Sequence, residues 1–305
     1  MPFSKFLGND LAKSCLQQML GYQNTANTLL FHGPEGVGKS LFALELAVAL
    51  MGPSHKSRIS THNHPDLHIL RGDGKSGLHA VESIRSLIEE VLTPPFEASC
   101  KVFIIHDAHH MLPVSANALL KTLEEPHLDA YIILLTDQPE ILLPTLLSRC
   151  RKIPFFPIPQ DLIETHLITL GKSQDEAERI VLLSDGSLSR ALMFASESHQ
   201  RKAALVEELF SCRLPSDYSA FIKIAAELEK ECGEDVETEG ESKWRQMDAI
   251  FEEILFKYSK MHRTASQKSP PLERIFERIE RCRLAVRRHI KLRVVLEELF
   301  RNNFT

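Results

Sequence analysis

The sequence lacks several features that would each point to a particular class of protein. Its six cysteines are scattered and form no C-x-x-C pair, which argues against a zinc ribbon and against a disulfide framework. It has no apolar run of membrane-spanning length and no basic-then-apolar leader. These absences predict a cytoplasmic protein with reduced thiols and no membrane partner.

Charge of neither sign dominates the chain, whose formal net charge is −5 over 305 residues. A strongly basic chain would attract nucleic acid and a strongly acidic one would repel it. Contact with DNA would therefore have to use a local patch or the charge of a partner. The length predicts two or three domains, and the hydrophobic fraction of 43% is ordinary for a globular protein.

The clearest motif is a phosphate-binding loop, G-x-x-x-x-G-K-S, at 33–40. An apolar run at 28–31 precedes it and an apolar helical run at 41–51 follows, which is the strand–loop–helix context that the motif needs. The alternative is a glycine-rich turn that matches by chance. The motif predicts a site for ATP and Mg²⁺, in which backbone N–H groups and the lysine hold phosphates and the serine ligates the metal. These residues are Gly33, Gly36, Gly38, Lys39 and Ser40.

Two further apolar runs end in polar residues suited to the same site. The run 101–105 is followed closely by Asp107, and the run 131–135 ends in Thr136. Several buried strands alternating with helices predict a parallel α/β sheet, which binds ligands beyond the carboxyl ends of its strands. Asp107 is predicted to hold Mg²⁺ through water, and Thr136 to contact the γ-phosphate or the attacking water. Each residue could instead simply end its strand.

The residue after Asp107 is informative because of what it lacks. ATPases of this kind place a glutamate there to orient and deprotonate water, whereas this chain has Ala108, followed by His109 and His110. A methyl group accepts no proton. The sequence therefore predicts that the chain's own ATP hydrolysis is weak or absent.

The stretch 52–78 reads as a loop that contains a short strand at 66–70. It also contains His55, His62, His64 and His68. A metal site is conceivable, but the spacing fits no tight zinc pattern, and solvated loop histidines are the favoured interpretation.

The remainder of the chain reads as helical. Helices are predicted at 81–92 and 115–125, a proline-marked boundary near 154–159, and three short helices between 161 and 195. The acidic stretch 227–241 is predicted to be an exposed, mobile connection. The basic stretch 274–301 is predicted to be a helix, which either contacts DNA or has a solvated face within an oligomer.

The stretch 101–151 closely resembles one family through four segments in succession: KVFIIHDAHHML, SANALLKTLEEP, LLTDQPEILLPTLLSRC and RKIPF. The chain resembles the gamma/tau and delta-prime clamp-loader ATPases of bacterial DNA polymerase III. The resemblance implies an AAA+ P-loop domain at 1–157, a helical lid at 158–200 and an all-α collar at 201–305. It also implies a ring of five subunits, formed with gamma/tau and delta, that places a sliding clamp on primed DNA.

In this family the arginine of S-R-C reaches the ATP that a neighbouring subunit binds, so the resemblance implies this role for Arg149. A guanidinium offered in trans stabilises charge at the γ-phosphate. The alternative is that Arg149 pairs with a local carboxylate.

Three departures from the family's pattern favour the delta-prime type. The cysteines that hold zinc in relatives are missing at 52–80, so no zinc is expected; Ala108 replaces the acid; and Ser189 stands where gamma-type lids carry an arginine, with Arg190 one residue later. An active gamma/tau-like ATPase, a P-loop nucleotide kinase and a scaffold that binds no nucleotide stay open as alternatives.

Overall fold

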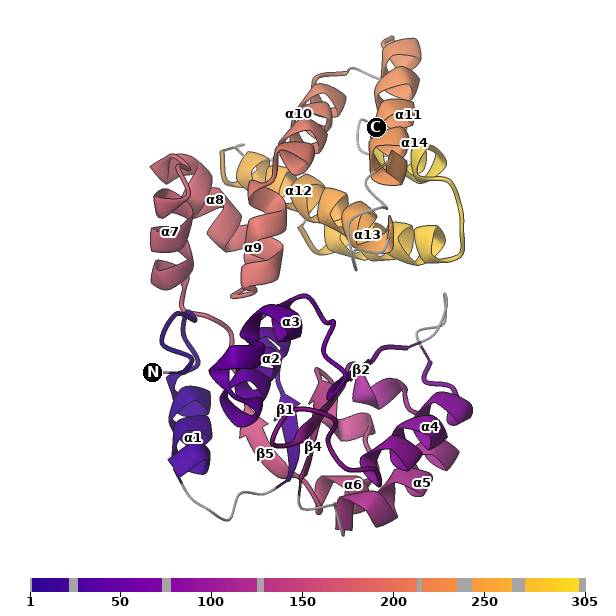
Figure 1. Cartoon of the computed structure of the whole chain (residues 1–305). Coiled ribbons are helices and arrows are strands. Elements are labelled where there is room, and N and C mark those ends of the chain that lie inside the picture. Colours follow the sequence, from indigo (N-terminus) through magenta and orange to yellow (C-terminus); the bar gives the residue numbers. More distant parts are fainter. Residues whose placement is uncertain are drawn as a thin grey trace. The chain divides into compact units, whose positions relative to one another are not determined.

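The computed structural model describes residues 2–21, 27–72, 78–124, 129–212, 216–234, 243–264 and 272–301. The chain forms two compact units (Figure 1). Unit 1 comprises Met1–His166 with Asp185–Ser189, and unit 2 comprises Leu167–Ser184 with Arg190–Thr305. The division into domains at 1–157, 158–200 and 201–305 stays a prediction.

Unit 1 is built on a five-stranded parallel sheet with the order β2-β3-β4-β1-β5. The strands are β1 (Thr28–His32), β2 (Leu67–Leu70), β3 (Lys101–Ile105), β4 (Ala130–Thr136) and β5 (Arg151–Pro154). Every predicted strand is present, because each is an apolar run that is buried by layers above and below the sheet. The α/β class predicted for this part of the chain, a parallel sheet with flanking helices, is confirmed.

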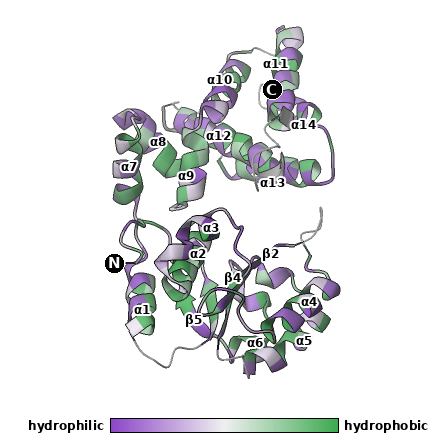
Figure 2. Cartoon of the chain, viewed as in Figure 1, coloured by the Kyte–Doolittle hydropathy of each residue, from purple (hydrophilic) through white to green (hydrophobic). Residues whose placement is uncertain are grey.

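Helices cover both faces of the sheet. Side chains alternate along each strand, so Leu29 and Phe31 pack with α2 (Lys39–Met51), whereas Leu30 packs with α4 (Val81–Val91) and α5 (Pro113–Glu124). Figure 2 shows hydrophobic residues gathered on the inner sides of these helices. The remaining helices of this layer structure are α1 (Asp10–Gly21) and α6 (Pro144–Leu147).

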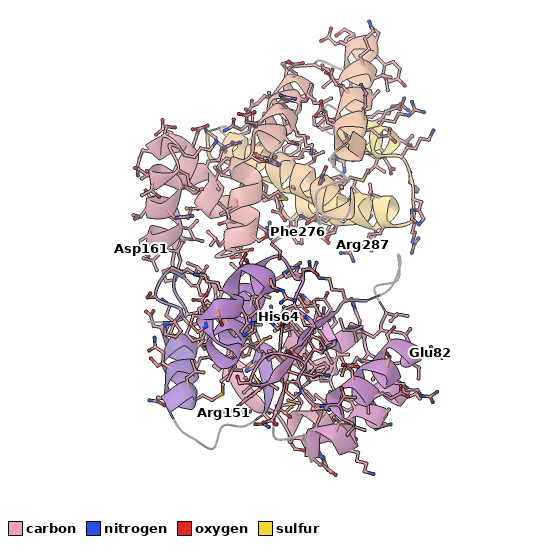
Figure 3. All side chains as sticks on the ribbon, in the orientation of Figure 1. His64, Glu82, Arg151, Asp161, Phe276 and Arg287 are labelled. Carbon is pink, nitrogen blue, oxygen red and sulfur yellow. The ribbon has the colours of Figure 1, made fainter. Side chains whose placement is uncertain are left out.

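The predicted loop at 52–78 contains more structure than expected. It begins with η1 (Pro53–His55) and α3 (Lys56–Ser60), and the predicted short strand is present as β2. The short helix escapes sequence reasoning because a single residue, Ile59, anchors it in the core, which gives no periodic signal. Residues 73–77 lie outside the described part of the chain. Figure 3 shows His64 inside unit 1 and Glu82 on its outside.

Two short 3₁₀ turns, η3 (Ala108–His110) and η4 (Pro139–Ile141), follow β3 and β4. The three predicted short helices are confirmed as α7 (Gln160–Thr169), α8 (Gln174–Ser184) and α9 (Leu188–Ala195). Unit 2 continues with α10 (Glu197–Ser211), α11 (Tyr218–Glu234), α12 (Lys243–Thr264), α13 (Leu272–Arg287) and α14 (Leu292–Arg301). None of the helices that the structure describes is both long and apolar enough to cross a membrane.

Two predictions in unit 2 need correction. The first half of the acidic stretch is not a loop, because α11 runs through to Glu234 and buries Leu228 and Cys232 on its inner face. Residues 235–242 lie outside the described part of the chain. The basic stretch forms two helices rather than one, because the chain turns between α13 and α14, where His289 adopts a φ of 63°. Arg287 and Phe276 are both on α13 (Figure 3).

Candidate nucleotide site

The phosphate loop lies between β1 and α2, at the carboxyl edge of the sheet, as the motif predicts. Two of its glycines have no room for a side chain. A Cβ on Gly33 would lie 2.1 Å from the carbonyl oxygen of Phe155, and a Cβ on Gly36 would lie 2.1 Å from the hydroxyl of Ser187. Both have positive φ angles, of 145° and 75°. Only glycine therefore fits at these two positions, where the loop packs closely against Phe155 and Ser187.

Lys39, the first residue of α2, folds back over this loop. Its ammonium donates hydrogen bonds of 2.6 Å and 2.7 Å to the carbonyl oxygens of Gly33 and Pro34. Burial lowers the pKa of Lys39, and the carboxylates of Asp137, Glu35 and Asp107 oppose that shift. Ser40 follows it on α2 and is half-buried. The donor set fits a phosphate, since a cation and a glycine-lined loop meet at one helix start.

The two other predicted strand-end residues lie at the same edge. Thr136 ends β4 beside His32 of β1, and its carbonyl oxygen accepts the N–H of Gly33 at 3.2 Å. Asp107 follows β3 in a left-handed conformation, with an exposed side chain. The structure thus brings Thr136 into direct backbone contact with the phosphate loop and places Asp107 after the end of β3, at the same edge of the sheet.

Ala108 is fully buried among apolar side chains that include Phe103 and Leu119. The next residue, His109, turns toward the site instead. Its Nδ1 lies 3.1 Å from the hydroxyl oxygen of Thr136 and 3.3 Å from Oδ1 of Asp137. Asp137 was not singled out from the sequence, and only its place directly after a strand-ending threonine could have drawn attention to it.

The segment 185–189, which belongs to unit 1, packs on the phosphate loop. The N–H of Ser189 donates to the carbonyl oxygen of Gly36 at 3.1 Å, and Ser187 lies against the same glycine. Arg190 instead donates to the carbonyl oxygen of Leu183 at 3.0 Å and lies 3.7 Å from Glu252. Ser189 thus contacts the loop through its backbone, while Arg190 contacts residues of unit 2.

Arg149 lies at the opposite edge of the sheet. It comes two residues before β5, whose first residue pairs with Leu29 near the start of β1, whereas the phosphate loop follows the end of β1. Its Nε donates to Oε1 of Glu124 at 2.7 Å, its Nη2 contacts the same oxygen, and its Nη1 donates to the carbonyl oxygen of Thr145 at 2.8 Å. The structure therefore does not bring Arg149 to this chain's own nucleotide site.

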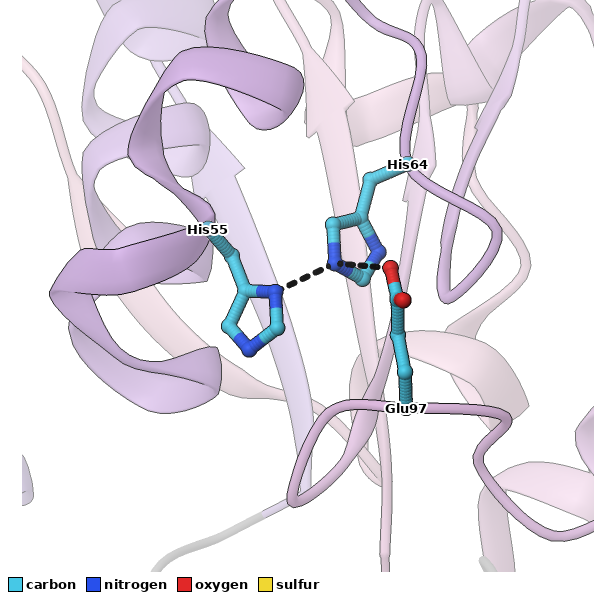
Figure 4. Close-up of side chains that lie close together, drawn as sticks. All are labelled: His55, His64 and Glu97. Carbon is cyan, nitrogen blue, oxygen red and sulfur yellow. Dashed lines mark hydrogen bonds and ion pairs between the residues drawn. The ribbon is translucent and has the colours of Figure 1, made fainter.

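His55 and His64, two of the loop histidines, lie close to the carboxylate of Glu97 (Figure 4). Nε2 of His64 lies 2.7 Å from Nδ1 of His55 and 3.2 Å from Oε1 of Glu97. The interpretation of solvated loop histidines is wrong for His64, whose side chain is buried. Its Nδ1 accepts the N–H of Asp66 at 3.1 Å, so its hydrogen must be on Nε2. A metal would need the lone pair that this hydrogen occupies, so the cluster fits a hydrogen-bonded bridge better than zinc.

The chain is similar in sequence and in fold to several known proteins. A sequence model of the family described as DNA polymerase III, delta subunit, matches residues 8–159. The delta-prime subunit of Bacillus subtilis DNA polymerase III is 34% identical over 195 residues, which cover 61% of this chain and 59% of that protein. The delta-prime subunit of Escherichia coli is 35% identical over 148 residues, covering 48% and 44%.

Gamma/tau subunits are similar as well. That of Mycoplasma genitalium is 31% identical over 208 residues, covering 62% of this chain and 34% of the relative. The alignments thus span less than two thirds of the relatives' own lengths. Among solved structures, a gamma subunit-related protein of Thermotoga maritima matches with a TM-score of 0.55 and 18% identity, covering 97% of this chain and 99% of that one. At this identity the likeness shows the fold.

Proposed function

Because the chain belongs to the family of the DNA polymerase III gamma/tau and delta-prime subunits, we propose that it is a clamp-loader subunit of the delta-prime type. It helps to load the sliding clamp onto primed DNA in the cytoplasm, as one of five subunits in a ring with gamma/tau and delta. The observation that carries the proposal is the separation of Lys39 and Arg149 at opposite edges of one sheet. One edge serves the chain's own nucleotide, and the other serves a neighbour.

The carboxyl edge holds ATP with Mg²⁺. Lys39 exchanges its two carbonyl partners for phosphate oxygens, so its desolvated ammonium stays hydrogen-bonded throughout. Ser40 and Asp107 are the residues that would hold Mg²⁺, directly and through water. When bound, the metal would neutralise negative charge on the phosphates. Thr136 offers its hydroxyl to the terminal phosphate.

Hydrolysis by the chain alone is weak, because its own site lacks a group that activates the attacking water and a cation that stabilises charge at the γ-phosphate. The residue in the place of the catalytic acid, Ala108, is buried and has no proton acceptor. Arg149 is held at the far edge of the sheet. An active gamma/tau-like ATPase would need a proton acceptor at position 108. This residue therefore separates the gamma/tau-like alternative from the delta-prime type.

Arg149 completes the neighbour's site instead. Its guanidinium already holds the carboxylate of Glu124 through Nε and Nη2. A phosphate can take the place of this carboxylate, because both groups offer negatively charged oxygen acceptors. Supplying the cation in trans makes ATP hydrolysis depend on assembly of the ring.

Two measurements on the full chain test this proposal. Equilibrium dialysis with ATP and Mg²⁺ should show binding, and co-purification with gamma/tau and delta should yield a complex whose ATPase depends on this chain. DNA-stimulated turnover by the isolated chain would favour the gamma/tau-like alternative. Phosphate transfer to a nucleoside monophosphate would favour the kinase, and no binding at millimolar ATP would leave only a scaffold.

A further inference from the structure

The hydroxyl of Thr136 is held by two groups of its own chain. It accepts the backbone N–H of Gln138 at 3.1 Å, and Nδ1 of His109 lies 3.1 Å from the same oxygen. Thr136 is 1% exposed and the His109 side chain is 5% exposed, so water competes little for these contacts. The orientation of the hydroxyl is therefore set by protein groups.

The direction of the contact between His109 and Thr136 follows from the neighbouring carboxylate. Oδ1 of Asp137 lies 3.3 Å from the same Nδ1. A lone pair on Nδ1 would be repelled by that nearby negative charge, whereas a hydrogen on Nδ1 is attracted to it. Nδ1 therefore carries a hydrogen, whether the ring is neutral or charged, and it donates toward Thr136.

The hydroxyl of Thr136 then has only its own hydrogen left for a further hydrogen bond. A hydroxyl has one hydrogen to donate and two lone pairs to accept with. Gln138 and His109 occupy the two acceptor positions, so the O–H must donate to a third group. Thr136 also joins the phosphate loop directly, because its carbonyl oxygen accepts the N–H of Gly33. The preset donor thus lies at the end of the phosphate cradle.

We propose that His109 is a positioning residue, which presets the Thr136 hydroxyl as a donor and so sets the preference of the site for a nucleoside triphosphate over a diphosphate. The inference rests on the proposed nucleotide site. A diphosphate lacks the terminal phosphate that the hydroxyl meets, and its contacts with Lys39 and the loop do not involve His109. Loss of His109 therefore weakens binding of the triphosphate alone.

The test is calorimetric titration of the full chain with a non-hydrolysable ATP analogue and with ADP, each with Mg²⁺. His109→Ala is expected to weaken binding of the analogue by about fivefold, the effect of one hydrogen bond, and to change the ADP dissociation constant less than twofold. His109→Asn restores the preference, because its amide can donate from the place of Nδ1. His109→Gln, whose amide lies farther along the side chain, does not. His62→Asn, at an exposed position outside this site, is the control, with no change for either nucleotide.

The outcomes separate this inference from the proposed function. If the unaltered chain binds neither nucleotide, the proposed site itself is wrong and the inference falls with it. If it binds both and His109→Ala leaves their ratio unchanged, the role of His109 is refuted while the proposed nucleotide site stands. Equal weakening of both nucleotides, or restoration by Gln as well as by Asn, would also refute the positioning role. Thermal unfolding of each variant shows whether it is folded.

Discussion

Arg149 and Glu124 form an ion pair on the side of unit 1 that faces away from the phosphate loop. Nε and Nη2 of the arginine share one carboxylate oxygen, and both side chains are partly exposed. Exposed pairs of this kind contribute about 0.2–1 kcal/mol. The pair thus orients the guanidinium while costing little to break when a phosphate of a neighbour is offered.

Glu124→Gln tests whether this carboxylate competes with a neighbour's phosphate for Arg149. We expect the free energy of unfolding to change by about 1 kcal/mol or less and the ATPase of the assembled ring to rise by no more than about fivefold, since only a weak competitor is removed. Chemical denaturation and steady-state ATPase assays measure the two effects. A large loss of ring ATPase would mean that Glu124 is needed to orient the arginine rather than to restrain it.

Gly36→Ala tests the packing of the phosphate loop against the segment 185–189. The new Cβ would lie 2.1 Å from the Ser187 hydroxyl at a φ of 75°, so either the loop or Ser187 has to move. We expect ATP binding to weaken by more than about tenfold, with backbone strain of about 1 kcal/mol or more. Gly21→Ala is the control, because a Cβ there meets nothing within 4 Å. Equal ATP affinity in both variants would contradict the description of the loop.

His64 predicts a loss of stability in mild acid. Burial lowers its pKa below the ordinary value of 6.5, with the neighbouring His55 acting in the same direction. The unfolded chain therefore takes up a proton first as the pH falls, so the free energy of unfolding decreases below about pH 6.5. His64→Gln should make this decrease shallower between pH 7 and 5. His62→Asn, at an exposed position with a φ of 56°, should leave it unchanged. Identical slopes for all three proteins would refute the assignment.

The bridge between His55, His64 and Glu97 predicts that zinc does not stabilise the chain. The hydrogen on Nε2 of His64 occupies the position that a metal would use, and Arg58 already pairs with Glu97. We expect the thermal midpoint to change by less than about 1 °C with equimolar zinc or with EDTA. A rise of several degrees with zinc, absent in His55→Ala, would show that the cluster rearranges into a metal centre.

The candidate nucleotide site could be predicted from the sequence, because its residues lie at the ends of strands. Gly33 to Ser40, Asp107 and Thr136 each follow an apolar run, and parallel strands bring such ends to one edge. The position of Arg149 at the opposite edge of the sheet follows from the strand register, which no local sequence pattern encodes. The family resemblance supplied the role proposed for Arg149, and the structure added its partner Glu124.

The features that escaped prediction depend on contacts between distant segments. His109 meets Thr136 across 27 positions of sequence, and the buried His64 is fixed by the backbone of its own turn and by a carboxylate from another loop. The predicted mobile connection at 227–241 is wrong for its first half, because Leu228 and Cys232 extend the inner face of α11 among charged neighbours. Composition describes the solvated face of such a helix, whereas burial of a few apolar residues decides its length.

The ATPase of the reconstituted ring tests the central claim most directly. Arg149→Ala should leave the folding of this chain and its own ATP affinity unchanged, and should lower hydrolysis at the neighbouring site that it serves by on the order of 10³-fold. Arg151→Ala, an exposed arginine two residues away, is the matched control and should leave the ring ATPase near its unaltered value. An unchanged ring ATPase with Arg149→Ala would contradict the account.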